Sequence, residues 1–230
     1  MELVTTPTPA VTAGTLLTEK LARRQDTPTL FLGSGGSATA VFSNMQLPPA
    51  GATLTLTTLD ERYVNDPAAR NFDQLVTTPF WRAAVAANAY VLRVDVGNTV
   101  DAHKAAARFD TALRAWRRQH PHGYVLALAG IGTDGHTAGI FKTADVRSCS
   151  AWACATTAPE AASPYQTRVT TTYAFFQDAV DEFVVYATGS AKRRLITALT
   201  HGSRDCGTMP ACIYRSLPGV TLVTDQTIYG

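Results

Sequence analysis

The chain alternates short apolar runs with longer segments in which apolar residues recur at helical spacing. Thr29–Gly33 and residues 124–129 are apolar and are closed by glycine, which predicts buried strands. Residues 52–59 alternate threonine with leucine, the period-two pattern of a strand. Further strands are predicted at 90–94, 167–172, 183–187 and Val220–Thr224, and helices at 11–24, 37–45, 79–88, 99–118 and 190–199.

This alternation of strands and helices predicts an α/β fold. We expect a single-domain, Rossmann-like architecture over residues 1–230, with a largely parallel sheet and helices on both faces. Residues 1–10 are expected to form an extended lead-in, because proline disfavours helix in the residue before it. Ligands of such folds bind at the carboxyl ends of the strands, and three glycine-rich or charged segments follow predicted strands here.

Composition and charge exclude several classes of partner. The net charge of +2 offers no basic surface for nucleic acid, and no stretch is apolar enough for a membrane helix. Because the first residues lack the pattern of a secretory signal, we expect a cytoplasmic protein. The cysteine spacings match no zinc or redox motif, so free thiols in a reducing compartment are expected. The cysteines are Cys149, Cys154, Cys206 and Cys212.

A glycine loop follows the first predicted strand and precedes a predicted helix. Backbone N–H groups at Gly35 and Gly36 could approach an anion, and the helix N-terminus would add a positive partial charge. Ser37 could cap the helix or donate to a phosphate. The alternative is a tight turn that binds nothing.

The same loop also fits a dinucleotide-binding fingerprint. Gly33, Gly35 and Ala38 match G-x-G-x-x-A, and Asp60 at the end of the next strand is where a ribose-binding acid would lie. A dinucleotide-dependent oxidoreductase is therefore a second hypothesis, although it leaves the motifs below without a role.

Three charged residues, Asp60, Glu61 and Arg62, directly follow the strand at 52–59. Charges in this position are costly unless they face a wet cleft or form pairs. They are therefore candidates for substrate binding. The alternative is a solvated loop with an Asp–Arg pair.

Residues 130–138 form a second glycine-rich segment, which contains Asp134 and His136. A neutral histidine is the usual general base, and a carboxylate fixes its orientation. We expect this segment to open a helix, whose N-terminus would disfavour the imidazolium form. The alternative is an Asx turn in which His136 has no chemical role.

Two cations occupy positions that suit an anion. Arg168 lies on a predicted strand, and Lys192 lies in the first turn of a predicted helix, where the dipole mildly disfavours a cation. A bound phosphate would remove that conflict. The alternative is that both are ordinary surface residues.

Together these segments resemble the glucosamine-6-phosphate isomerase/6-phosphogluconolactonase family over about residues 29–225. The strongest match is 130–138, which contains the specific Asp-Gly-His-Thr-Ala sequence. The other matching segments, in order, are 34–37, 60–64, 71–72, 168–170, Gly189 with Lys192, 210–211 and Asp225.

The resemblance implies roles for the candidate residues. His136 would activate water for attack on a lactone carbonyl and return the proton to the ring oxygen. Arg62 would stabilise the oxyanion, and Asp134 would orient His136 or help to position the substrate. No metal or other cofactor is implied. The implied substrate-binding residues are Gly35, Gly36, Ser37, Asp60, Arg168 and Lys192, with the phosphate held by Arg168, Lys192 and the glycine loop.

Two positions favour the lactonase branch of the family. Deaminase relatives generally carry Glu where Phe141 stands and Tyr where Arg62 stands. Residues 38–40 and Lys142 depart from the family pattern, which usually has Thr-Pro and Pro there, so the geometry of both loops is open.

The resemblance implies hydrolysis of 6-phospho-D-glucono-1,5-lactone to 6-phosphogluconate in the pentose phosphate pathway. We expect a monomer or weak homo-oligomer whose partner is this small phosphosugar lactone, and no nucleic acid or membrane partner. The alternatives are a non-catalytic sugar-phosphate-binding module, a dinucleotide-binding oxidoreductase and a glucosamine-6-phosphate deaminase-like isomerase.

Overall fold

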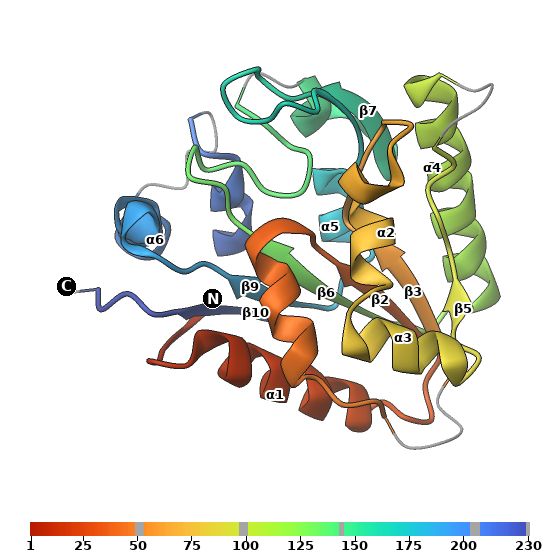
Figure 1. Ribbon diagram of the computed structural model, residues 1–230, viewed down its shortest axis with the longest axis horizontal. Helices are drawn as coiled ribbons and strands as arrows, with labels where there is room; N and C mark the ends of the chain where they lie inside the picture. The colour runs from red at the N-terminus through yellow and green to blue at the C-terminus, as the bar shows by residue number, and fades with distance from the viewer. Residues whose placement is uncertain (49–52, 97–100, 143–144, 203–207, 229–230) are drawn as a thin grey trace.

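A seven-stranded parallel sheet forms the centre of the molecule (Figure 1). The computed structural model describes residues 1–48, 53–96, 101–142, 145–202 and 208–228. Every neighbouring pair in the sheet is parallel, which confirms the predicted architecture. In spatial order the strands are β1 (Glu2–Thr5), β10 (Val220–Thr224), β9 (Glu182–Tyr186), β6 (Tyr124–Gly130), β2 (Thr29–Gly33), β3 (Leu54–Thr58) and β5 (Tyr90–Val91).

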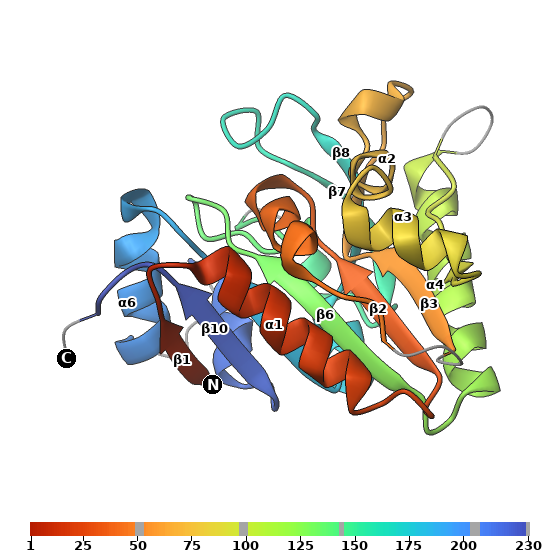
Figure 2. The same cartoon turned by 60° about the horizontal axis from the view of Figure 1, so that its bottom comes forward.

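Helices cover both faces of this sheet, as the sequence predicted (Figure 2). Alternate residues of β2 point to opposite sides: Leu30 and Leu32 join a core with the helix α4 (Ala102–Gln119), and Phe31 joins a core with the helix α1 (Pro9–Ala22). The helices are α1 (Pro9–Ala22), α2 (Asn71–Leu75), α3 (Pro79–Ala86), α4 (Ala102–Gln119), α5 (Tyr173–Asp178) and α6 (Arg193–His201). The 3₁₀ helices are η1 (Gly36–Asn44), η2 (Pro67–Ala69), η3 (Asp145–Ser148), η4 (Ser190–Lys192) and η5 (Pro210–Arg215).

A small antiparallel sheet, which the sequence did not predict, lies beyond the end of β3. Its order is β4 (Asp60–Arg62), β8 (Thr167–Thr171) and β7 (Ala153–Thr157). Only β8 was predicted as a strand. The charged side chains of β4 are typical of a loop, and β7 consists of small residues and threonine without a clear period-two pattern. The register places Arg62 opposite Arg168, so the small sheet joins two segments that are distant in sequence.

Several predicted boundaries change. The lead-in contains β1, which pairs with β10 at the sheet edge, and the strand at 90–94 shrinks to β5. The helix at 37–45 is the 3₁₀ helix η1. The helix at 99–118 begins at Ala102, where Asp101 accepts a hydrogen bond from the Lys104 N–H at 2.8 Å. Residues 52, 99 and 100 of the predicted elements lie outside the described residues.

The prediction of free thiols is wrong. Cys149 and Cys154 form a disulfide that ties η3 to the start of β7. Cys212 is also disulfide-bonded, whereas Cys206 lies outside the described residues. Spacing along the chain does not reveal which cysteines the fold brings together. Within the described ranges, no helix is both long and apolar enough to cross a bilayer.

Candidate active site

The candidate site lies where the strand order of the large sheet reverses. From β2 the chain proceeds to β3 and β5 on one side, and from β6 it proceeds to β9 and β10 on the other. In such sheets the loops at this point diverge and leave a crevice at the carboxyl ends of the strands. A cavity of about 320 Å³ lies there. Every predicted site residue except Asp134 lines it.

The segment that follows β6 presents His136 from a tight turn. The N–H of Gly132 donates to the His136 carbonyl at 2.9 Å, and the N–H of Gly135 donates to the Gly132 carbonyl at 3.0 Å. No helix follows directly, and Ala138 adopts a φ of 48°. The prediction that this segment opens a helix is therefore wrong, and no helix dipole acts on His136 from its own segment.

Glycine is required at position 132 because the imidazole lies against its backbone. A Cβ at Gly132 would lie 2.1 Å from both Nδ1 and Cε1 of His136. On the other side, the His136 ring packs on Phe141 with 4.7 Å between ring centroids. The ring is thus held between a bare backbone and an aromatic side chain.

Asp134 fixes the tautomer of His136. Its Oδ1 lies 2.5 Å from Nδ1 of His136 and also accepts the backbone N–H of His136 at 3.1 Å. Burial favours a higher pKa for Asp134, but the hydrogen bond and the charge of His136 outweigh it and lower the pKa below its ordinary value. Because an ionised carboxylate only accepts, Nδ1 carries the proton and Nε2 can accept one. Asp134 therefore bonds to Nδ1 of the ring and leaves Nε2 as the nitrogen that can serve as a base.

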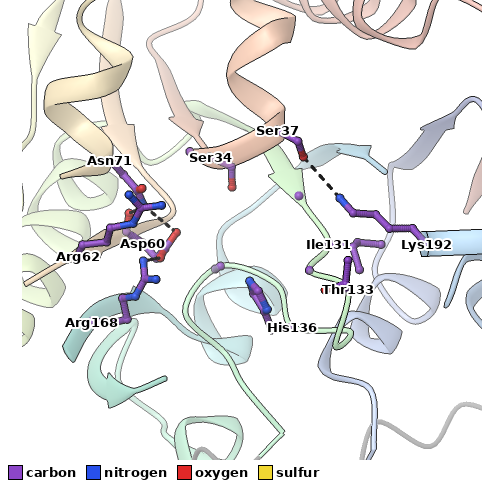
Figure 3. A pocket seen from close by; sticks show the side chains of 15 residues that line it. Ser34, Ser37, Asp60, Arg62, Asn71, Ile131, Thr133, His136, Arg168 and Lys192 are labelled. Carbon is purple, nitrogen blue, oxygen red and sulfur yellow. Dashed lines mark hydrogen bonds and ion pairs between the residues drawn. The ribbon is translucent and has the colours of Figure 1, made fainter. Parts of the chain in front are cut away.

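Lys192 and Ser37 occupy one end of the cavity. Lys192 Nζ lies 3.5 Å from Ser37 Oγ (Figure 3). Gly35 and Gly36 precede Ser37 at the start of η1. Burial lowers the pKa of Lys192, while the nearby Asp225 opposes that shift. Ser37 does not cap η1, which begins without a side-chain cap. This end combines a partly buried ammonium, a hydroxyl and a helix start, which suits an anion.

Asp60 and Arg168 occupy the opposite end as a buried pair. Arg168 Nη1 lies 3.3 Å from Asp60 Oδ2, and each residue is only 7% exposed. Arg168 also donates to Ser163 Oγ at 2.9 Å and to the Tyr165 carbonyl at 3.2 Å. Burial lowers the pKa of Arg168, while the charge of Asp60 opposes the shift. The solvated-loop alternative for Asp60 is therefore wrong, since its partner comes from a distant strand.

Arg62 extends into the same end of the cavity from β4. Its Nη1 donates to the Ala69 carbonyl at 2.9 Å, and its guanidinium lies 5.4 Å from the centroid of the Tyr165 ring. These contacts hold the guanidinium at the cavity wall, where it can meet developing negative charge.

Glu61 points away from the cavity and joins β4 to α2. Its carboxylate accepts the backbone N–H groups of Arg62, Asn71 and Phe72 at 2.8, 2.6 and 2.8 Å. Burial raises the pKa of Glu61 to about 7, although these three donors oppose the shift. Glu61 is thus a structural residue that positions its cavity-lining neighbours.

Comparison with known proteins identifies the family. The family model described as glucosamine-6-phosphate isomerases/6-phosphogluconolactonase matches residues 10–222. The chain belongs to this family. Among curated protein sequences, none matches the chain.

Solved structures share the fold over almost the whole chain. A 6-phosphogluconolactonase from Shewanella baltica is 20% identical with a TM-score of 0.76, covering 97% of this chain and 95% of its own. The enzyme from Thermotoga maritima is 22% identical with a TM-score of 0.73, covering 96% and 97%. That from Trypanosoma brucei is 19% identical with a TM-score of 0.76, covering 97% and 95%. At these identities the likeness establishes the fold.

The positions of the two cations in the cavity differ from the expectation based on the sequence. Arg168 and Lys192 were expected to hold one phosphate together, but His136 lies between them in the cavity (Figure 3). Arg168 is grouped instead with Asp60 and Arg62. The sequence could not show this, because the Asp60–Arg168 pair spans 108 residues.

One cavity residue, Asn71, had no role assigned to it. It begins α2, lines the cavity and is 3% exposed. The resemblance included its position, but an asparagine at the start of a helix carries no specific chemical signal. Elsewhere in the described ranges, no group of three or more His, Cys, Asp or Glu side chains is arranged to hold a metal ion.

Proposed function

We propose that this chain hydrolyses 6-phospho-D-glucono-1,5-lactone to 6-phosphogluconate. One observation supports this most strongly: His136, with Nδ1 bonded to Asp134, stands between the Lys192 end and the Arg62 end of one cavity. This order matches a phosphorylated sugar lactone, which has an anion at one end and an electrophilic carbonyl at the other. Family membership supports a sugar phosphate as the ligand.

The phosphate would bind at the Lys192 end. Lys192 supplies a positive charge, Ser37 a hydroxyl donor, and the backbone of Gly35 and Gly36 the start of η1. Asp225 accepts the Gly189 N–H at 2.9 Å and so fixes the loop that carries Lys192. Arg168 is already neutralised by Asp60, so we assign it to the sugar end of the cavity instead.

The chemical step would use His136 as base and then as acid. Nε2 takes a proton from water, and the water oxygen forms a bond to the lactone carbonyl carbon. The carbonyl electrons move to its oxygen, where Arg62 stabilises the negative charge. As this intermediate collapses, the bond between carbon and ring oxygen breaks, and His136 returns its proton to the ring oxygen. Asp134 stabilises the imidazolium that forms between these transfers.

The isomerase activity of the family is disfavoured by the surroundings of His136. Ring opening of an amino sugar needs a proton relay through the histidine. Here the ring contact is Phe141, which is buried and has no titratable group. Release of ammonia from glucosamine 6-phosphate would contradict this assignment.

A dinucleotide site is disfavoured as well. Asp60 would have to bind a ribose, but its carboxylate accepts from Arg168 at 3.3 Å and from Asn71 Nδ2 at 3.3 Å. The fingerprint residue Ala38 is buried within η1. Binding of NAD or NADP in a calorimetric titration would revive the oxidoreductase hypothesis.

A role in the pentose phosphate pathway follows if this reaction is correct. A cytoplasmic location and a monomeric or weakly associated state remain predictions. The Cys149–Cys154 disulfide is typical of oxidising compartments, so it counts against the reducing compartment that the cysteine spacing suggested.

The test is direct measurement of lactone hydrolysis. Fresh 6-phosphogluconolactone is generated with glucose-6-phosphate dehydrogenase, and its loss is followed against the spontaneous background. We expect the protein to accelerate the loss. Tight binding of 6-phosphogluconate without acceleration, by folded protein, would instead identify a non-catalytic sugar-phosphate-binding module.

A further inference from the structure

The turn that carries His136 packs against the 3₁₀ helix η5. The N–H of Ala211, in η5, donates to the Gly135 carbonyl at 3.0 Å. Met209, just before η5, packs on Gly135, where an added Cβ would lie only 2.8 Å from Met209 Cγ. Gly135 itself has a φ of 83°, which favours glycine. The shape of the turn is therefore held from outside by a segment that is distant in sequence.

Two hydrogen bonds in series connect η5 to the two ends of the turn. Thr137 directly follows His136, and its hydroxyl donates to the Gly130 carbonyl at 3.0 Å. Thr137 Oγ1 also lies 2.5 Å from the hydroxyl oxygen of Tyr214, in η5. Because the single hydroxyl proton of Thr137 is donated to a carbonyl, which only accepts, the proton between the two hydroxyls must come from Tyr214. Tyr214 thus donates to Thr137, and Thr137 donates to Gly130.

The hydroxyl of Tyr214 is held in place by its surroundings. Tyr214 and Thr137 are both fully buried. The Tyr214 ring packs on Phe183 and Phe176, with centroid distances of 5.2 and 6.4 Å. Burial raises the pKa of Tyr214, so the phenol keeps its proton and remains a donor. These contacts fix the position that Tyr214 imposes on the Thr137 hydroxyl.

The Thr137 hydroxyl closes the segment that presents the catalytic pair. Gly130 ends β6 and lines the cavity, so its bond to Thr137 joins the two ends of the segment that contains Asp134 and His136. The orientation of the imidazole depends on this closure, because the ring lies against the backbone of the same short turn. A displacement of about 1 Å at a catalytic group can cost about 100-fold in rate.

We propose that Tyr214 is a positioning residue for lactone hydrolysis, acting on His136 through the hydroxyl of Thr137. This proposal rests on the proposed function. Tyr214 does not line the cavity, so its contribution is to fix the turn from which Nε2 of His136 meets the attacking water. Loss of the Tyr214 hydroxyl should therefore slow the chemical step and leave binding of the phosphate at the Lys192 end unchanged.

The test separates kcat from KM in Tyr214→Phe, which keeps the ring and removes only the hydroxyl. We expect kcat for 6-phosphogluconolactone to fall by about tenfold and KM to stay within about twofold of the wild-type value. Tyr124→Phe is the matched control. Tyr124 is a second buried tyrosine, and its hydroxyl donates to Glu182 Oε1 at 2.9 Å outside the cavity. This variant should also lose stability in urea denaturation, but it should keep the wild-type kcat.

The route through Thr137 is tested from the other side of the same contact. Thr137→Val keeps the shape of the side chain but removes both hydrogen bonds, so kcat should fall at least as far as in Tyr214→Phe. Thr137→Ser keeps the hydroxyl and should retain most of kcat. Because the two hydroxyls act in series, the double variant with valine at 137 and phenylalanine at 214 should be no slower than Thr137→Val alone.

Three results would overturn the proposal. A folded Tyr214→Phe protein with the wild-type kcat is one, and an equal fall in kcat in Tyr124→Phe is another. Fully additive losses in the double variant would show that Tyr214 does not act through Thr137. Failure of the wild type to hydrolyse the lactone would overturn the proposed function itself, and this proposal with it.

Discussion

The two sheets supply polar side chains to the cavity in different ways. Loops of the large parallel sheet present His136 and Lys192, which are partly exposed. The small antiparallel sheet presents Asp60 and Arg168, which are buried and paired with each other. A buried charge depends on its partner for stability, whereas a loop cation does not. Substitution of a cavity residue that the large sheet presents should therefore reduce activity but not the free energy of unfolding. Substitution of a cavity residue that the small sheet presents should reduce both.

The largest expected effect on stability is at Arg168. Arg168→Ala leaves the buried Asp60 carboxylate without its ion pair, so we expect the free energy of unfolding to fall by about 3–5 kcal/mol in urea denaturation. Arg194→Ala, at an exposed arginine on α6, is the control and should change it by less than about 0.5 kcal/mol. Equal losses in the free energy of unfolding for the two variants would contradict the proposed difference between the two sheets.

Lys192→Ala should show the opposite behaviour. Loss of a charged donor to the phosphate should weaken substrate binding by about 1.5–3 kcal/mol, seen as a higher KM for the lactone. The free energy of unfolding should change little. Lys104→Ala, at an exposed lysine on α4, is the control for the loss of one positive charge away from the cavity. An unchanged KM in Lys192→Ala would contradict the assignment of the phosphate to this end of the cavity.

Gly132→Ala sharpens the comparison within the large sheet. The methyl group would occupy the space of the His136 ring and turn it away from Asp134. Misplacement of a catalytic group on this scale should lower kcat by about 10- to 100-fold. Because Lys192 is untouched, KM should stay near the wild-type value. A raised KM with unchanged kcat would show that the turn positions substrate rather than the imidazole.

The small sheet should also make stability depend on pH. The pKa of Glu61 is raised by burial from 4.5 to about 7, so the folded state binds an extra proton between these values. Stability should therefore be greatest below this window and fall as pH rises to about 7, by at most about 1.4 kcal/mol per pH unit. Urea denaturation of Glu61→Gln should show a flatter profile. Identical slopes for wild type and variant would contradict the assignment.

The sequence predicted the large sheet better than the small one. Apolar runs such as Thr29–Gly33 are buried strands whatever surrounds them, and their order with the helices limits the topology. Asp60–Arg62 becomes a strand only because β8, far along the chain, supplies its backbone partners, and Arg168 on that strand supplies a compensating charge. The sequence pattern around these residues does not indicate such a contact.

The candidate site divides in the same way. His136 with Asp134 and the glycine loop could be recognised because each lies within one short segment. The separation of Arg168 from Lys192 and the contact between Thr137 and Tyr214 depend on packing between segments. The disulfide at Cys149 and the missing helix after β6 were also decided by tertiary structure rather than by spacing.

The most direct test of the central claim compares lactone hydrolysis by wild type and His136→Ala. The account predicts that the variant loses at least about 100-fold in kcat, the usual contribution of a general base, while its free energy of unfolding and its affinity for 6-phosphogluconate are retained. A folded His136→Ala protein that hydrolyses the lactone at the wild-type rate would contradict the mechanism proposed for this cavity.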